Sequence, residues 1–303
     1  MDINEKIAAF DPNGMGDTNG TIYGLPFDAD TANLVILPVP WEVTVSYQAG
    51  TASAPEAILE ASYQVDLFDP FVKDAWKLGL AMKDIDLDLA AKSDTLRQKA
   101  EHYINQLAAG SSIEKNPDLG VILAEVNQAC SEMNAWVKKQ SLELLNQQKL
   151  VGLLGGDHST PLGLMQAVAA KYPAFGILHI DAHADLRKAY EDFEFSHASI
   201  MYNALKIEQV THLVQVGIRD YCEAELNLIG SDKRITTFFD RDIKHQQYEG
   251  SSCSAICDRI IDSLPEKVYL SFDIDGLDPK LCPGTGTPVP GGLEMEQAIY
   301  LIE

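Results

Sequence analysis

The chain has 303 residues, of which 46% are hydrophobic, and can bury the core of one large α/β domain or two small ones. Its net charge of −22 argues against nucleic acid or an anionic membrane as a partner, because both attract basic patches. The N-terminus lacks the basic and apolar pattern of a secretory signal, and no apolar run is long enough to span a membrane. The five cysteines are scattered and odd in number, so we expect reduced thiols and a cytoplasmic protein.

The chain begins with residues 1–31, which are rich in Gly, Asp, Asn and Thr and are expected to form an irregular N-terminal arm. Residues 32–303 are expected to form one α/β domain, since no linker divides them. The first buried strand is predicted at 33–39, where prolines interrupt the apolar run. A loop over 41–50 and a helix over 55–61, with proline in its first turn, follow it.

Strand and helix patterns alternate along the rest of the chain. A strand is predicted at 77–82, and helices are predicted at 93–109 and 121–148, the second long and amphipathic. Further strands are expected at 149–154, 175–180, 212–218, 235–239 and 267–273, and further helices at 161–171, 197–206, 221–229 and 251–264. This alternation is typical of a three-layer α/β/α domain with a mostly parallel sheet, covered by helices on both faces.

Three of the predicted strands end in acidic residues or histidine. In the longest of these motifs, three such residues alternate with alanine, and a period of two places them on one side of the chain. The carboxyl ends of parallel strands meet at one crevice, so all three motifs are expected to converge. The six candidate ligands are His158, Asp181, His183, Asp185, Asp273 and Asp275. Any one of them alone would be interpreted as a helix cap or a satisfied polar group. Together they predict a divalent metal site, because buried carboxylates need a compensating charge.

The three motifs resemble the signatures of a known family. Gly-Gly-Asp-His-Ser at 155–159, Asp-Ala-His-Ala-Asp at 181–185 and Ser-Phe-Asp-Ile-Asp-Gly-Leu-Asp-Pro at 271–279 are similar to those of the ureohydrolases, which include arginase and agmatinase. The resemblance extends from about Leu34 to the end of the chain. It implies the arginase/deacetylase fold, a homo-oligomer (trimer or hexamer), and a small guanidino substrate from which urea is released.

The resemblance also implies a role for each ligand in binding two divalent metal ions. Asp181 and Asp273 would bridge the ions, His158 and Asp185 would complete one shell, and His183 and Asp275 the other. Four carboxylates and two imidazoles suit manganese better than zinc, with nickel or iron as further options. A bridging hydroxide would attack the guanidinium carbon, and Asp185 would orient it as a catalytic residue.

Three other residues receive roles from their positions. His197 matches the family's histidine that is proposed to shuttle protons, a task that suits imidazole. Asp157 adjoins a ligand and is expected to be a structural carboxylate. His179 is expected to be a core histidine that points away from the metal face.

The substrate is indicated less directly. Arg187 stands where arginases carry an asparagine that binds the amino-acid head of arginine, and the loop ending at Gly50 lacks the family's usual arginine. Both differences count against arginine and leave agmatine, guanidinobutyrate or guanidine. Trp41 and Tyr47 are expected to close over such a substrate, and Arg187 is a further candidate contact.

The family normally continues past Glu303 into another strand, whose glutamate contacts the guanidinium, and a closing helix, so we expect this sequence to be truncated. Two alternatives remain open within the family: a formiminoglutamase-type amidine hydrolase and a non-catalytic homologue that binds metal. The presence of all six ligands argues against the second. A metallophosphoesterase would need a Gly-Asn-His-Asp/Glu motif, which the sequence lacks.

Overall fold

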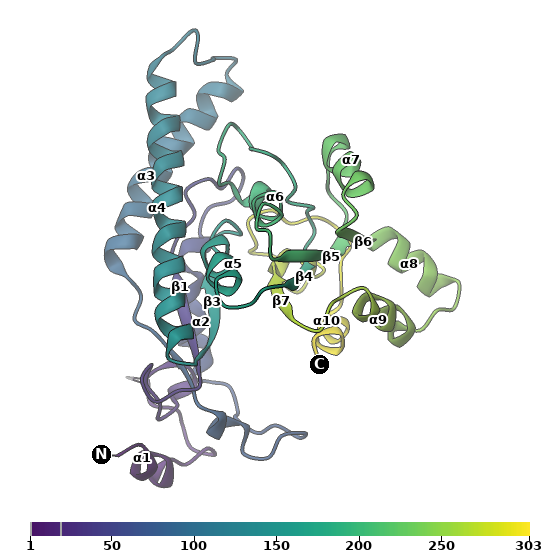
Figure 1. The fold of residues 1–303 in the computed structure, drawn as a ribbon. Coiled ribbons are helices and arrows are strands. Elements are labelled where there is room, and N and C mark those ends of the chain that lie inside the picture. Colours follow the sequence, from purple (N-terminus) through teal and green to yellow (C-terminus); the bar gives the residue numbers. More distant parts are fainter. Residues whose placement is uncertain (1, 19) are drawn as a thin grey trace.

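The computed structural model describes residues 2–18 and 20–303. Within them, parallel strands form two sheets (Figure 1). The first sheet has the order β2-β1-β3, with β1 at Leu34–Val39, β2 at Leu80–Met82 and β3 at Leu150–Gly155. The second has the order β6-β5-β4-β7, with β4 at Phe175–Ile180, β5 at Val210–Ile218, β6 at Ile235–Phe239 and β7 at Val268–Phe272. The predicted α/β class with parallel strands is therefore confirmed.

The division into two sheets differs from the single sheet expected. In the described part of the chain, β3 and β7 are edge strands, and no ladder joins them. An apolar run identifies a buried strand but does not specify its partner, so the pattern could not predict this break. The two sheets nevertheless meet at their carboxyl ends, where His158 after β3 lies 2.8 Å from Ser271 of β7, measured from Nε2 to Oγ.

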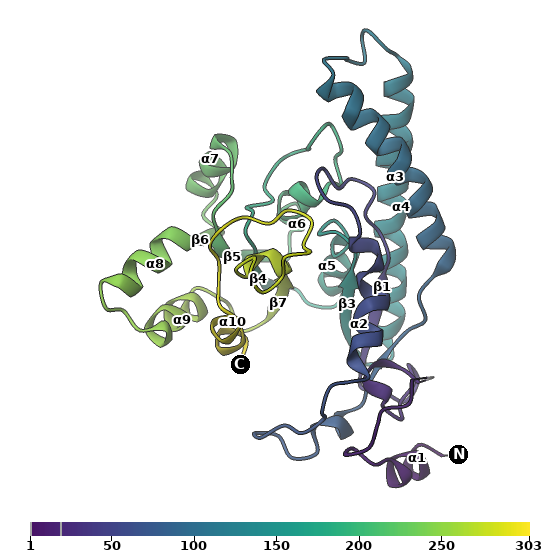
Figure 2. The same cartoon turned by 180° about the vertical axis from the view of Figure 1, so that it is seen from behind.

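The helices flank the sheets in both views (Figures 1 and 2). Their bounds are α1 Ile3–Ala9, α2 Ala54–Ser62, α3 Leu87–Ala108, α4 Asp118–Asn146, α5 Leu162–Ala169, α6 Ile200–Ala204, α7 Glu223–Ser231, α8 Asp240–Tyr248, α9 Cys253–Asp262 and α10 Met295–Ile302. Helices α3 and α4 form a long hairpin that projects beyond the strands. Among the described residues, no helix has an apolar stretch long enough to cross a membrane.

Strand β4, in the middle of the second sheet, is buried on both faces. In β4, Ile177 packs in one apolar cluster with Leu162 of α5 and Met201 of α6. Its neighbour Leu178 packs in another, which includes Ile260 of α9. This alternation follows from the pleat of the strand and produces the expected three layers.

The N-terminal segment is more ordered than its composition predicts. Helix α1 lies within the expected irregular arm, and its first turn is closed by a hydrogen bond from Asp2 N–H to the Glu5 carboxylate (3.1 Å). Ile3 and Ile7 share one face of the helix and pack against the apolar cluster beneath β1. Their spacing of four residues was the signal for this helix.

Candidate metal centre

The ends of β3, β4 and β7 bring four candidate ligands together. From Nδ1 of His158, the distances are 2.8 Å to Asp181 Oδ2, 3.0 Å to Asp185 Oδ2 and 3.4 Å to Asp273 Oδ2. His158 follows β3, whereas the carboxylates follow β4 and β7. The first group of donors is therefore assembled from both sheets.

A second group lies beside the first and shares one residue with it. Nδ1 of His183 lies 3.4 Å from Asp181 Oδ1 and 3.1 Å from Asp275 Oδ2. Asp181 therefore directs one carboxylate oxygen to each group. Asp275 is fixed in place by the Ala182 N–H, which donates to its Oδ1 at 3.0 Å.

The setting of His158 provides a test of whether a metal fits. Among the residues that the structure describes, its Nδ1 forms no hydrogen bond, although three carboxylate oxygens lie 2.8–3.4 Å away. Its Nε2 faces the hydroxyl of Ser271, which can accept a hydrogen bond from it. Against the effect of burial, Asp181, Asp185 and Asp273 raise the pKa of His158 well above its ordinary value, so Nδ1 lies where a positive charge is favoured. A metal ion can take the place of that proton, with a neutral imidazole that donates from Nε2.

The carboxylates of the two groups also destabilise one another's charged forms. Burial and the charge of Asp181 raise the pKa of Asp185 well above its ordinary value. Burial and the charges of Asp275 and Asp181 raise the pKa of Asp273 to about 7. Burial would raise the pKa of Asp181 too, but the imidazoles around it, His179 foremost, hold it well below its ordinary range. Divalent cations would relieve the repulsion, so this oxygen-rich donor set fits them.

Asp185 presents its carboxylate from a strained backbone. Its φ of 55° lies in the left-handed region, which costs about 1–2 kcal/mol for a residue with a Cβ. The conformation aims its carbonyl at the start of α6, where it accepts hydrogen bonds from Met201 N–H (3.0 Å) and Tyr202 N–H (3.1 Å). These two bonds hold the candidate ligand at the turn.

His179 does not point away from the ligands as expected. It is fully buried, and its Nε2 lies 2.8 Å from Asp181 Oδ2. Residues two apart in a strand share a face, so the spacing from Asp181 in fact predicts this contact. Asp157 lies outside both ligand groups, and its Oδ1 accepts a hydrogen bond from Ser159 N–H (2.8 Å).

A small cavity of about 140 Å³ adjoins the two groups. It is lined by Ser46, His183, Asp185, Arg187, Tyr190, His197, Ala198, Asp220, Tyr221, Glu225 and Thr287. His197 is partly buried there, and its ring meets Tyr190 edge-on with 6.2 Å between centroids. Burial and the nearby imidazoles His183 and His158 lower the pKa of His197 to about 4. Its imidazole is therefore neutral at pH 7.

The loop that carries Tyr190 is held from outside by the α3–α4 hairpin. Tyr103 of α3 donates its hydroxyl to Asp192 Oδ2 (3.1 Å). Asn127 of α4 donates to the Asp192 carbonyl (3.2 Å) and accepts from Glu194 N–H (2.9 Å). Asp192 itself has a left-handed φ of 62°, so these contacts stabilise a conformation that the segment would otherwise disfavour.

The three expected substrate contacts occupy different environments. Trp41 has an exposed fraction of 0% and belongs to the core beneath α3 and α4, so it does not face the cavity. Tyr47 is 71% exposed, and the neighbouring Ser46 lines the cavity in its place. Arg187 does line it, with its guanidinium carbon 4.9 Å from the centre of the Tyr190 ring.

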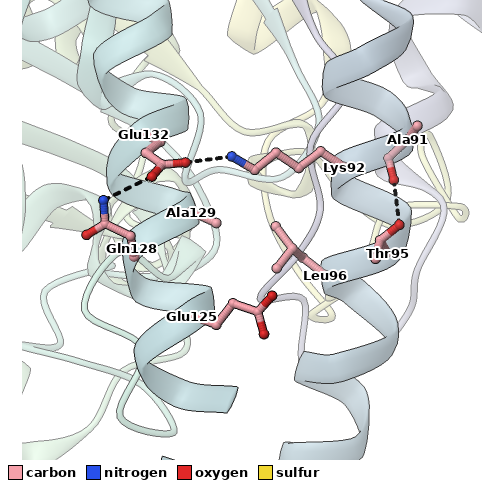
Figure 3. A pocket seen from close by; sticks show the side chains of 8 residues that line it. All are labelled: Ala91, Lys92, Thr95, Leu96, Glu125, Gln128, Ala129 and Glu132. Atoms are coloured by element: carbon pink, nitrogen blue, oxygen red, sulfur yellow. Dashed lines mark hydrogen bonds and ion pairs between the residues drawn. The ribbon is translucent and has the colours of Figure 1, made fainter. Parts of the chain in front are cut away.

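A larger cavity of about 510 Å³ lies between α3 and α4 (Figure 3). It shares no lining residue with the smaller cavity. Figure 3 shows the ion pair between Lys92 and Glu132 that spans it, at 2.7 Å. It contains no histidine and no group of candidate ligands, so we assign it no chemistry.

Comparison with known proteins identifies the family. A model of the arginase family matches residues 32–303. The chain belongs to the arginase family. It is 32% identical over 274 residues to the N(1)-aminopropylagmatine ureohydrolase of Thermus thermophilus, which covers 90% of this chain and 78% of that protein. It is 29% identical over 279 residues to the agmatinase of Citrobacter koseri, covering 91% and 76%.

Solved structures support the same fold. The agmatine ureohydrolase of Thermoplasma volcanium aligns with 99% of this arginase-family chain and 84% of its own, with a TM-score of 0.67 and 20% identity. The arginase of Bacillus cereus aligns with 89% and 84%, with a TM-score of 0.61 and 22% identity. The expected ureohydrolase resemblance is thus confirmed, and the chain is a hydrolase related to agmatinase.

Sequence reasoning missed several residues that order this site. The guanidinium of Arg219 donates to the carbonyls of Asp275 (2.6 Å), Leu277 (3.1 Å) and Val289 (3.0 Å). Thr287, in the same segment as Val289, donates its hydroxyl to Asp275 Oδ2 at 3.2 Å. No local pattern indicates an arginine that binds distant carbonyls, so Arg219 gave no signal.

Proposed function

We propose that this chain is a binuclear metal-dependent ureohydrolase that cleaves a guanidinium C–N bond and releases urea. The observation that carries the proposal is Asp181, which directs one oxygen toward His158 and the other toward His183. A carboxylate between two groups of donors is suited to bridging two ions. Asp273 would bridge the ions with it, His158 and Asp185 would complete one shell and His183 and Asp275 the other, with manganese favoured by the oxygen-rich set. When bound, such ions lower the pKa of water toward neutrality.

The residues around the cavity can handle the protons of this reaction. His197 is neutral at pH 7 because its pKa is lowered to about 4, so it begins as a proton acceptor. It lines the same cavity as Asp185. His197 can therefore accept a proton near Asp185 and donate it to the leaving amine. Asp185 can accept a hydrogen bond from the attacking water and orient it, because its carboxylate faces both the ligands and the cavity.

The charges at the cavity favour an amine-bearing substrate of the agmatine type. Arg187 is already engaged by the Tyr190 ring and by Glu225, whose Oε2 lies 3.8 Å from its Nε. It is therefore poorly placed to bind the carboxylate of a guanidino acid. Asp220 lines the cavity with a 67% exposed side chain and can attract the ammonium group of a substrate tail. The relatives named as agmatinase and as N(1)-aminopropylagmatine ureohydrolase support this class.

Urea release tests the proposal directly. We would compare agmatine, N(1)-aminopropylagmatine, guanidinobutyrate and arginine as substrates, with protein loaded with manganese or nickel. We expect the highest kcat/KM for one of the two amine-bearing compounds. Arginine or guanidinobutyrate as the best substrate would contradict the assignment of the substrate class.

Metal content tests the centre itself. We expect two ions per chain by elemental analysis, and Asp273→Ala should lose at least one ion and nearly all activity. Asp278→Ala is a matched control, because this acidic residue of the same loop belongs to neither ligand group. An Asp273→Ala protein that retains both ions would contradict the proposed ligands.

A further inference from the structure

A row of polar side chains crosses the second sheet one step before the metal ligands. Ser271 of β7 pairs with His179 of β4, His179 pairs with Gln215 of β5, and Gln215 pairs with Thr237 of β6. Residues paired in this way project from the same face of the sheet. We call Ser271, His179, Gln215 and Thr237 the polar row.

The polar row is connected by hydrogen bonds to both sides of the first ligand group. Ser271 Oγ lies 2.8 Å from His158 Nε2, and His179 Nε2 lies 2.8 Å from Asp181 Oδ2. Gln215 Nε2 lies 3.0 Å from His179 Nδ1, and the Thr237 hydroxyl donates to Gln215 Oε1 at 3.0 Å. The row therefore reaches two ligands that come from different sheets.

The position of the protons follows from the amide of Gln215. Its Nε2 also lies 2.8 Å from the carbonyl oxygen of Ala184, which can only accept a hydrogen bond. The reverse orientation of the amide would place two acceptors face to face, so Nε2 is the donor to His179 Nδ1. A neutral His179 that accepts at Nδ1 carries its proton on Nε2, and it donates that proton to Asp181.

This tautomer also decides what His179 can do. Its Nε2 lies within the first ligand group, close to Asp181 and 3.9 Å from Asp185 Oδ2. A protonated nitrogen has no lone pair for a metal, so His179 cannot bind an ion through Nε2 while Gln215 donates to Nδ1. His179 therefore contacts the ligand Asp181 and does not contact the metal ion.

Burial of the polar row would be unfavourable if its side chains were not hydrogen-bonded to one another. His179 and Gln215 each have an exposed fraction of 0%, and apolar clusters cover both faces of the sheet around them. Polar groups in such a position are costly unless each is hydrogen-bonded, and a shared network fixes their orientation.

We propose that His179 is a positioning residue for the metal ligand Asp181, with Gln215 and Thr237 setting its tautomer. The proposal rests on the metal site of the proposed function and adds the groups that orient it. By directing the Nε2–H bond at one oxygen of Asp181, the row fixes the carboxylate between the two groups of ligands. Partners of this kind change metal affinity by about 10–100-fold.

The first test measures the tautomer without any metal. Imidazole ¹⁵N shifts of the metal-free protein should show a neutral His179 with its proton on Nε2. In Gln215→Leu the donor to Nδ1 is gone, so this preference should weaken. A proton on Nδ1 in the unmodified protein would overturn the proposal.

The second test measures manganese affinity by titration calorimetry. We expect His179→Asn and Gln215→Leu to weaken binding by about 10–100-fold while two ions still bind at saturation. Thr237→Val leaves the buried shape almost unchanged and should weaken binding by about two- to tenfold. The control is Thr211→Val, which removes a hydroxyl of β5 that donates to the Phe175 carbonyl (3.1 Å), lies 3.0 Å from His212 Nδ1 and contacts no residue of the row. This control should bind manganese normally.

The outcomes separate this proposal from the proposed function. If Asp273→Ala loses an ion but His179→Asn and Thr237→Val bind manganese as the unmodified protein does, the role of the polar row is wrong and the metal site stands. If His179→Asn binds only one ion at saturation, His179 is a ligand and the positioning role is wrong. Thermal unfolding of each variant identifies any that fail to fold, and Thr237→Val keeps the test decisive should Gln215→Leu be one of them.

Discussion

The hydrogen bonds between α4 and the loop at 186–196 lead to a prediction about activity at a distance. Asn127 of α4 bonds the backbone of Asp192 and of Glu194, at 3.2 and 2.9 Å, and touches no metal ligand. Replacing it with leucine removes both bonds while keeping a side chain of similar size. The loop leads into His197, so we expect Asn127→Leu to lower activity by disordering the position of this residue.

The size of the effect follows from the number of bonds. Each is worth about 0.5–1.5 kcal/mol, so their joint loss destabilises the ordered loop by about 1–3 kcal/mol. Every 1.36 kcal/mol corresponds to a factor of ten, so the ordered fraction falls by at most about 5- to 150-fold. Asp192 has a left-handed φ of 62°, which is strained for a residue with a Cβ. Without the Asn127 bonds that hold this residue, the loop is expected to become disordered.

The assay combines kcat/KM for urea release with metal content and hydrogen exchange of the loop. We expect kcat/KM to fall within that range, exchange at 188–196 to accelerate, and metal content to stay unchanged. Gln128→Leu is the control, because this side chain bonds Glu132 of its own helix. Normal kcat/KM together with faster exchange would refute the link between loop order and His197. Loss of metal would show that the hairpin supports the ligands instead.

Three further predictions concern single side chains. Trp41→Ala should destabilise the protein by about 3–5 kcal/mol because the indole is fully buried, whereas Tyr47→Ala should change stability by about 0.5 kcal/mol or less. Thermal unfolding measures both, and equal effects would contradict the core position of Trp41. Burial raises the pKa of the Cys130 thiol to about 12, so Cys130 should not react with a thiol reagent at pH 8 until the protein is unfolded. Rapid labelling of the native protein would contradict this. His197→Asn should retain its metal and lose about 100-fold or more in turnover, and unchanged turnover would leave His197 without a catalytic role.

Much of the site could be predicted because two simple rules govern it. Alternation along a strand end places Asp181, His183 and Asp185 together, and the convergence of parallel strands adds the residues that follow β3 and β7. The same alternation, applied one step earlier, places His179 beside Asp181 and Ser271 beside Asp273. The expectation for His179 is wrong because the period of two along the strand, and not its position inside the sheet, determines which way its side chain points.

Other features depend on contacts between distant segments. Trp41 follows a proline at the end of a strand, and no local pattern indicates whether such a residue turns into the core or toward a cavity. The guanidinium of Arg219 binds carbonyls more than 50 positions away. The break between β3 and β7 is a matter of strand pairing, which apolar runs do not encode.

The origin of the ligands in two sheets has a consequence for cooperative unfolding. In the described residues no β-ladder joins the sheets, and His158 is the candidate ligand supplied by the first. Ions bound at the centre would act as a cross-link between halves of the molecule, and ligands that bind only the folded state add to its stability. With metal, calorimetry should therefore record a single transition. After chelation calorimetry should record two transitions, one for the part that carries β1, β2 and β3 and one for the rest.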